Sequence, residues 1–179
     1  NVSMRLTHVT IHNFRGILDA SISFHPYSLL VGANNAGKST VIDCIRAFYE
    51  KDGFKFKADC DFPLKGAADQ ESWVDLTFSL TKQEDDSLKD EYKAANGDLK
   101  VRKYFQTAKK LHDGKNAAGS ILGYKSGCSL SDEPFYGAKN VQSGKFGDLI
   151  YIPAISKVDE HTKLSGPSAL RDLITNIMS

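Results

Sequence analysis

The stretch Gly32-Ala33-Asn34-Asn35-Ala36-Gly37-Lys38-Ser39-Thr40 decides how the rest of the chain is interpreted. It matches the pattern G-x-x-x-x-G-K-[ST], in which two glycines let the backbone turn inward around phosphate groups. The lysine of this pattern brings a positive charge to the phosphates, and the hydroxyl after it ligates Mg²⁺. We therefore expect Lys38 to act in catalysis and Ser39 to hold Mg²⁺. The residues expected to contact the nucleotide, ATP, are Gly32, Asn34, Asn35, Ala36, Gly37, Lys38, Ser39 and Thr40.

The segments on either side of this loop have the patterns that such a loop requires. Residues 27–31 form a short apolar run, which is typical of a buried strand. The residues after the loop carry one apolar helical stripe, made of Val41, Ile42, Ile45 and Phe48. This stripe predicts a helix over about residues 39–49 that stops near Gly53, and its N-terminus would favour bound phosphate. A glycine turn that matches the pattern by chance is the alternative interpretation.

Length and composition favour one compact domain in a reducing compartment. A chain of 179 residues can bury one sizeable core, and we place the domain over residues 4–179. Residues 1–3 precede a methionine that resembles a natural start, and we interpret them as an expression scar. The three cysteines lack a C-x-x-C pair, which disfavours zinc and a disulfide framework and favours the cytoplasm. No apolar run reaches the roughly 20 residues of a membrane helix, so no membrane partner is expected.

Two strands are predicted ahead of the phosphate strand. Residues 4–14 are rich in apolar side chains, and residues 18–24 alternate strictly between apolar and polar. Gly16 between them predicts a hairpin. Alternation and turn residues then predict a surface loop over 54–69, a strand over 73–80, a short exposed helix over 83–96 and a strand over 99–110. The last predicted elements are a turn at Asp113-Gly114, a strand over 121–124, a buried strand over 149–152 and a helix from Pro167.

The hairpin turn, Asn13-Phe14-Arg15-Gly16, separates this chain from small kinases and GTPases, which usually meet their phosphate loop on the first strand. The sequence resembles the ABC-type ATPase heads of SMC and RecF proteins. These heads open with a strand, an N-F-R-x turn, a second strand and then G-x-N-x-x-G-K-[ST]. The variant G-x-N-N-x-G-K-S is most similar to the OLD family (overcoming lysogenization defect), nucleases of the kind found in Gabija phage defence. Residues 151–154 and 168–173 are similar to the end of the first ATPase lobe in that family.

The resemblance implies an α/β P-loop NTPase fold, namely the N-terminal lobe of an ABC-type ATPase with a mixed sheet. It further implies that ATP and Mg²⁺ are bound, and that Arg15 lies near the phosphates or the base. In such heads two protomers clamp ATP between them, which implies a homo-oligomer. The function implied is that of the ATP-binding lobe of an ATP-dependent endonuclease, acting on DNA in processing, repair or phage defence.

The chain also departs from the family pattern. Ala154 stands where many SMC-like heads have a glutamine that serves Mg²⁺ and the attacking water, unless Ser156, Asp159 or Glu160 takes that role. No acidic Walker-B strand and no signature helix are evident, and a Toprim nuclease would have to lie downstream. We therefore expect the 179 residues alone to be inactive as an ATPase.

Three alternatives to an OLD-like protein stay open. The first is a RecF- or SMC-like repair ATPase, and the second is a P-loop kinase, although residues 53–70 contain no lid arginine. The third is a nucleotide-sensing dimerisation module that does not hydrolyse ATP.

Other polar side chains allow weaker hypotheses. One basic segment interleaves with Tyr104 and Phe105 and would suit either a DNA-contacting face, with Lys100, Arg102 and Lys103 each neutralising a phosphate, or a solvated strand face. Its basic residues are Lys100, Arg102, Lys103, Lys109 and Lys110. The five histidines are expected at the surface or at strand edges.

Overall fold

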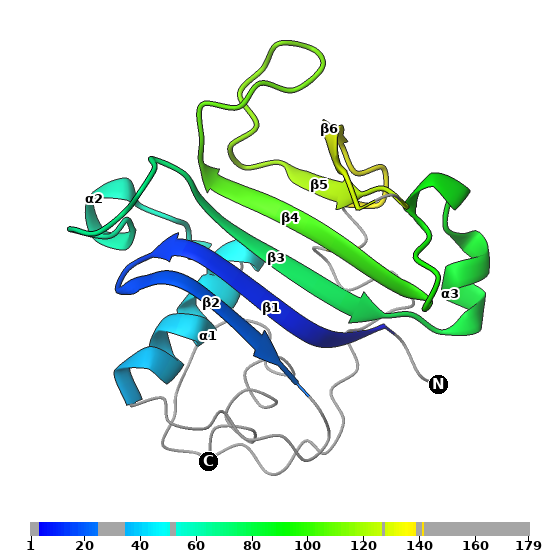
Figure 1. Ribbon diagram of the computed structural model, residues 1–179, viewed down its shortest axis with the longest axis horizontal. Helices are drawn as coiled ribbons and strands as arrows, with labels where there is room; N and C mark the ends of the chain where they lie inside the picture. The colour runs from blue at the N-terminus through cyan, green and yellow to red at the C-terminus, as the bar shows by residue number, and fades with distance from the viewer. Residues whose placement is uncertain (1–3, 25–34, 51–52, 127, 139–140, 142–179) are drawn as a thin grey trace.

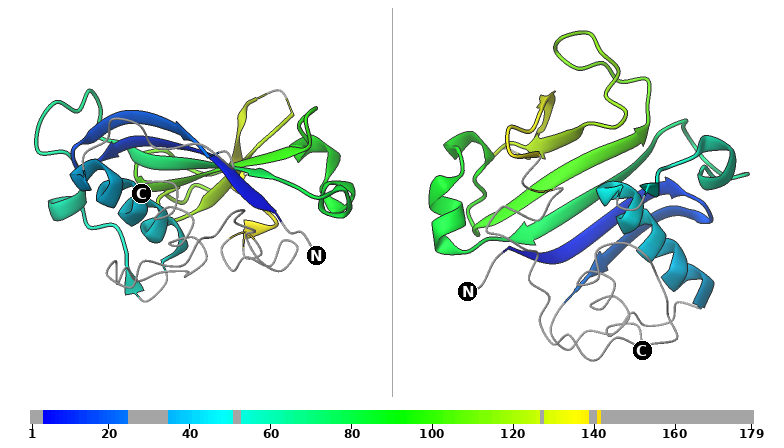
Figure 2. Two further views of the ribbon diagram at one scale, coloured as in Figure 1. Left: turned by 90° about the horizontal axis from the view of Figure 1, so that it is seen from below. Right: turned by 180° about the vertical axis from the view of Figure 1, so that it is seen from behind.

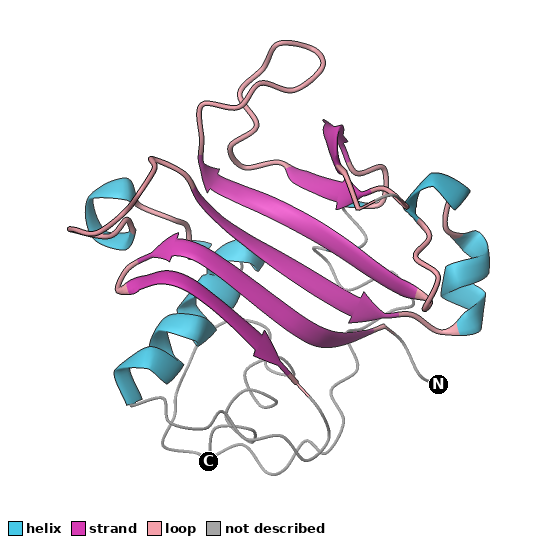
Figure 3. Ribbon diagram, viewed as in Figure 1, coloured by secondary structure: helices cyan, strands magenta, loops and turns pink. Residues whose placement is uncertain are grey.

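The computed structural model describes residues 4–24, 35–50, 53–126, 128–138 and 141, and in residues 35–38 the backbone alone. Six strands form one sheet in the order β2-β1-β3-β4-β5-β6, and α1 crosses one face of it (Figure 1). The elements in chain order, drawn by type in Figure 3, are β1 (Arg5–Phe14), β2 (Ile17–Ser23), α1 (Asn35–Tyr49), α2 (Ala58–Asp61), β3 (Ser72–Ser79), α3 (Lys82–Ser87), the 3₁₀ helix η2 (Asp90–Tyr92), β4 (Asp98–Gln106), β5 (Ile121–Tyr124) and β6 (Leu130–Pro134).

The predicted hairpin at the start of the chain is confirmed. β1 and β2 pair antiparallel, with Ile11 opposite Ala20 and Phe14 opposite Ile17. The turn between them is tight, and both Asn13 and Arg15 adopt left-handed backbone conformations there, with φ of 52° and 55°. β1 also pairs with β3 on its other side, so this strand lies inside the sheet.

The strands predicted over 73–80 and 121–124 are confirmed as β3 and β5. β4 ends at Gln106, short of the predicted 110, because the chain beyond it turns away into a loop over 107–120. All pairs among the described strands are antiparallel. The predicted strands over 27–31 and 149–152 and the helix from Pro167 lie outside the described residues, and a mixed sheet therefore stays a prediction.

The loop predicted over 54–69 contains the short helix α2, and the charged segment after β3 forms a shorter helix than predicted. α3 begins with a capping box, in which the Thr81 hydroxyl accepts from the Glu84 amide and the Glu84 carboxylate accepts from the Thr81 amide. The expected single exposed helix was wrong, because Leu88 and Tyr92 are buried in the core. Leu88 has an extended backbone, which ends α3 and turns its side chain inward.

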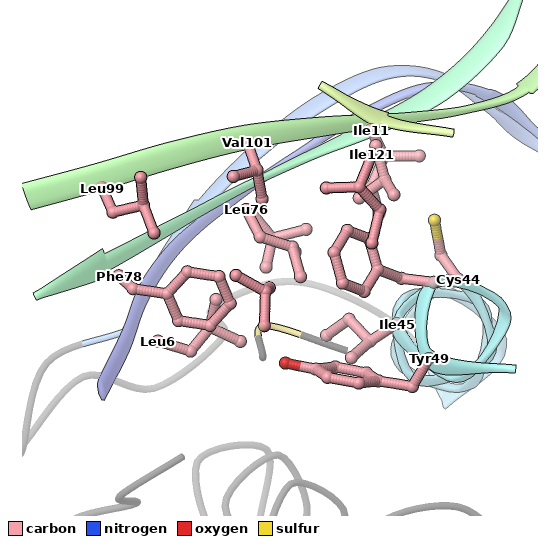
Figure 4. Packing of buried hydrophobic residues seen from close by; sticks show 14 of the residues in the cluster. Leu6, Ile11, Cys44, Ile45, Tyr49, Leu76, Phe78, Leu99, Val101 and Ile121 are labelled. Carbon is pink, nitrogen blue, oxygen red and sulfur yellow. The ribbon is translucent and has the colours of Figure 1, made fainter. Parts of the chain in front are cut away.

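The core lies between α1 and one face of the sheet, called here the core face (Figures 2 and 4). α1 contributes Cys44, Ile45 and Tyr49, all less than 5% exposed. Cys44 is fully buried. The sheet contributes buried side chains from β1, β3, β4 and β5, among them Leu6, Ile11, Leu76, Phe78, Leu99, Val101 and Ile121. Burial of this apolar face fixes α1 against the sheet.

A buried lysine on the core face fixes the C-terminal end of α1. The Lys103 ammonium donates to the Phe48 carbonyl oxygen at 2.9 Å and pairs with the Glu50 carboxylate. Its side chain is 3% exposed. Burial lowers the pKa of Lys103 below its ordinary value, against the opposing effect of Glu50. A positive charge at this end of a helix satisfies its last carbonyl groups and complements its dipole.

We predict that Lys103→Met destabilises the protein, because the Phe48 carbonyl loses its donor and the Glu50 carboxylate keeps only the exposed Lys55 as a partner among the described residues. The cost of such unpaired groups is about 1–3 kcal/mol. Denaturant unfolding followed by circular dichroism measures it. Lys100→Met is the matched control on the same strand, since the Lys100 side chain is 44% exposed and its loss should change stability by less than about 0.5 kcal/mol. Equal midpoints for the two variants would contradict the capping role.

Candidate functional site

The phosphate-loop pattern runs into the first turn of α1. The helix begins at Asn35, four residues before the start predicted from the apolar stripe. The first four amide groups of a helix have no partner within it. Here those amides belong to Asn35, Ala36, Gly37 and Lys38, and the first turn carries no acidic residue. The backbone of this turn can therefore receive an anion.

Of the other predicted nucleotide contacts, Gly32 and Asn34 lie outside the described residues. Ser39 is exposed at the end of this first turn, and Thr40 is half-buried. An exposed hydroxyl at the end of the first helical turn is available to a metal ion or to solvent. Among the described residues, no group of three or more His, Cys, Asp or Glu side chains could itself hold a metal.

Arg15 joins the hairpin turn to α1. Its Nη1 donates to the Asp43 carboxylate at 2.5 Å, and the same carboxylate accepts from Arg46 at 3.0 Å. Asp43 follows Ser39 by four residues, which places the two side chains on one face of the helix, one turn apart. Arg15 thus contacts a helix residue that lies about one turn, or about 5–6 Å of rise, from Ser39.

α2 supplies the second partner of Arg15. The Asp61 carboxylate accepts from Arg15 Nε at 2.9 Å, and the Asp61 carbonyl accepts from the Arg15 amide at 2.6 Å. Asp61 is 4% exposed, and its other carboxylate oxygen accepts from the Lys57 amide. Burial alone would lower the pKa of Arg15, but the hydrogen bonds to Asp61 and Asp43 raise it above its ordinary value. The guanidinium therefore stays charged.

Sequence reasoning selected Arg15 but missed both of its carboxylate partners. Asp43 carried a usable signal, because it lies one helical turn from Ser39 on the predicted helix. Asp61 carried none, since it lies 46 residues from Arg15 in a segment predicted as a surface loop. Contact of Arg15 with a nucleotide stays a prediction.

His12 anchors the same turn from the opposite face of the sheet, called here the outer face. Its Nδ1 lies 2.7 Å from the Asp19 carboxylate and its Nε2 lies 3.0 Å from that of Asp69. The ring stacks on Trp73, with centroids 5.0 Å apart. Burial lowers the pKa of His12, but the hydrogen bonds and charges of the two carboxylates raise it, for a net rise above 6.5. His12 is thus an ion-paired anchor rather than a plain surface histidine.

Three basic residues of β4 do not form one surface. Lys103 faces the core, whereas Arg102 is on the outer face, because side chains alternate along a strand. Arg102 is already bound to both oxygens of the buried Asp75 carboxylate, at 2.7 and 3.1 Å, and lies 3.5 Å from the centroid of Trp73. The expectation of one basic face made of Lys100, Arg102 and Lys103 was therefore wrong, whereas DNA binding stays a prediction.

The described part of the chain has no helix long and apolar enough to cross a membrane.

Comparison with known proteins places the chain in a family. A family model described as "AAA ATPase domain" matches residues 4–164. Over 185 aligned residues the chain is 26% identical to the Old nuclease of Escherichia phage P2. The alignment covers 99% of this chain and 30% of that nuclease, so the chain spans less than a third of its relative. The α/β phosphate-loop fold and the resemblance to the OLD family are thereby confirmed.

We predict that His12 makes stability depend on pH. Because its pKa is raised by folding, its ion pairs contribute fully below about pH 6.5 and their contribution is lost as pH rises through the raised pKa. Urea unfolding at several pH values between 6 and 9, followed by fluorescence of Trp73, measures this loss. His12→Gln should remove that part of the pH dependence. His112→Gln, whose side chain is 76% exposed, should retain it. Parallel stability curves for wild type and His12→Gln would contradict the prediction.

Proposed function

Because the chain belongs to the AAA ATPase domain family, we propose that residues 32–40 bind ATP together with Mg²⁺. The observation that carries this proposal is that α1 begins inside the G-x-x-x-x-G-K-[ST] pattern. The unpartnered amides of the first turn, the partial positive charge of the helix end and the Lys38 ammonium then act at one place. No acidic side chain in that turn opposes an anion.

Lys38, Ser39 and Arg15 each have a defined part in this proposal. Lys38 contacts the β- and γ-phosphates and stabilises charge that develops on them. Ser39, exposed at the end of the first turn, holds Mg²⁺. When bound, Mg²⁺ neutralises phosphate charge. Arg15, held one turn along α1, adds a third cationic group at the edge of the same site.

We further propose that the full-length protein is an OLD-like ATPase coupled to a DNA endonuclease, located in the cytoplasm and acting in DNA processing, repair or phage defence. The support is the similarity to the Old nuclease across this chain. In this proposal two ATPase heads clamp ATP between them, so the partners are DNA and a second protomer. A RecF- or SMC-like repair ATPase is the nearest alternative. A kinase is disfavoured by the absence of arginine in residues 53–70, and a non-hydrolysing sensor would bind ATP without turnover.

We predict that Lys38→Ala weakens ATP binding about tenfold to a hundredfold, because a charge-assisted contact is worth about 1.5–3 kcal/mol. Calorimetric titration with Mg²⁺ and ATP measures the affinity. Lys82→Ala is the matched control, since Lys82 is exposed on α3 and distant in sequence from the loop. Equal affinity of Lys38→Ala and wild type would refute the assignment.

We predict that these 179 residues bind ATP weakly and do not turn it over, whereas the full-length protein does. In the family that the chain resembles, hydrolysis needs a water-orienting carboxylate and a signature loop from the opposing protomer, and the sequence of these 179 residues shows a pattern for neither. Such groups supply many powers of ten in rate. Phosphate release at matched concentrations distinguishes the two. Robust turnover by the 179 residues, abolished by Lys38→Ala, would instead favour the kinase-like alternative.

A further inference from the structure

We propose that Asp61 of α2 is a positioning residue for the nucleotide site, acting on bound phosphate only through Arg15. This inference rests on the proposed function, because it assumes that ATP binds at the start of α1. It adds that the segment carrying α2 is part of the site, although its sequence predicts a surface loop.

Arg15 has an unusual backbone conformation. Its φ of 55° lies in the left-handed region, which side chains with a Cβ avoid, although Gly16 next to it could have taken that conformation freely. The Arg15 amide is held in this conformation by the Asp61 carbonyl at 2.6 Å. Strained residues persist where surrounding contacts determine them, and they concentrate at functional sites.

The nitrogen atoms of the Arg15 guanidinium have different partners. Nε donates to Asp61 and Nη1 donates to Asp43, so two edges of the fork are already used. Nη2 makes no hydrogen bond to any residue that the structure describes. The Arg15 side chain is 32% exposed, so a phosphate can reach it. Two carboxylates thus fix the plane of the guanidinium while one terminal nitrogen stays available.

Asp61 is itself fixed by burial and by a second hydrogen bond. Its side chain is 5% exposed, and its second oxygen accepts from the Lys57 amide at 2.8 Å within the same turn. A surface carboxylate on a mobile side chain could not orient a guanidinium in this way. Asp43 is the complementary partner, because it lies on α1 one turn after Ser39 and thereby sets the distance of Arg15 from the phosphate loop.

A double-mutant cycle in the full-length protein tests the proposal. ATP affinity is measured by calorimetry for wild type, Arg15→Ala, Asp61→Asn and the double variant, after thermal unfolding has shown that each is folded. We expect Arg15→Ala to weaken binding about tenfold or more and Asp61→Asn to weaken it several-fold. In the Arg15→Ala background, Asp61→Asn should cause no further loss. A merely structural role of Asp61 would instead give losses that multiply.

Asp59→Asn is the matched control, because Asp59 is exposed on the same short helix and should leave affinity unchanged. If Asp61→Asn does not fold, Asp61→Glu takes its place in the cycle, since it keeps the charge but displaces it by one methylene. Multiplicative losses, or unchanged affinity of Arg15→Ala, would overturn the proposal. Lys38→Ala tests the proposed function independently of Asp61. If Lys38→Ala loses ATP binding, the nucleotide site is retained even when the role of Asp61 is overturned. If Lys38→Ala binds ATP like wild type, the nucleotide site itself is refuted.

Discussion

The structure depends on how α1 is held by charges from distant parts of the chain, at its middle and at its C-terminal end. At the middle of the helix, Arg15 of the hairpin turn binds Asp43. At its C-terminal end, Lys103 of β4 binds the last carbonyl groups and Glu50. The apolar stripe alone would fix the face of the helix but would define its position along the sheet only loosely. These two contacts define that position, and with it the place where the phosphate-loop backbone begins to coil.

Much of the fold could be predicted because its signals are local. The strict alternation in residues 73–80 and the turn at Gly16 each depend on a few adjacent residues, and both predictions were confirmed. The helix over 83–96 was mispredicted because Leu88 and Tyr92 are drawn into the core by tertiary packing. The highly charged composition of residues 83–96 does not predict that these two side chains are buried. Their packing overrides the local helix propensity.

The candidate site shows the same division. Its phosphate loop is a contiguous pattern and could be identified from the sequence, whereas the groups that hold Arg15 come together only in the fold. The error at β4 has a related cause. Lys103 and Arg102 are adjacent in sequence and equally basic, yet one faces the helix and the other faces Trp73. Composition shows that the segment is basic, but only the pairing of β4 in the sheet determines whether each basic side chain lies on the core face or on the outer face.

The strand order has a consequence for the order in which the protein acquires its structure. β1 can pair with β2 as soon as the hairpin has emerged from the ribosome, because only the turn separates them. Its other edge waits for β3, with Ile11 facing Val74, and α1 is synthesised in the interval. Lys103, which binds the C-terminal end of α1, emerges later still, 55 positions after Phe48. Closing such long loops costs chain entropy before any contact repays it. The apolar face of α1 is therefore complete before β3, β4 and β5 are synthesised. A nascent chain paused there exposes part of that face to chaperones or to other chains.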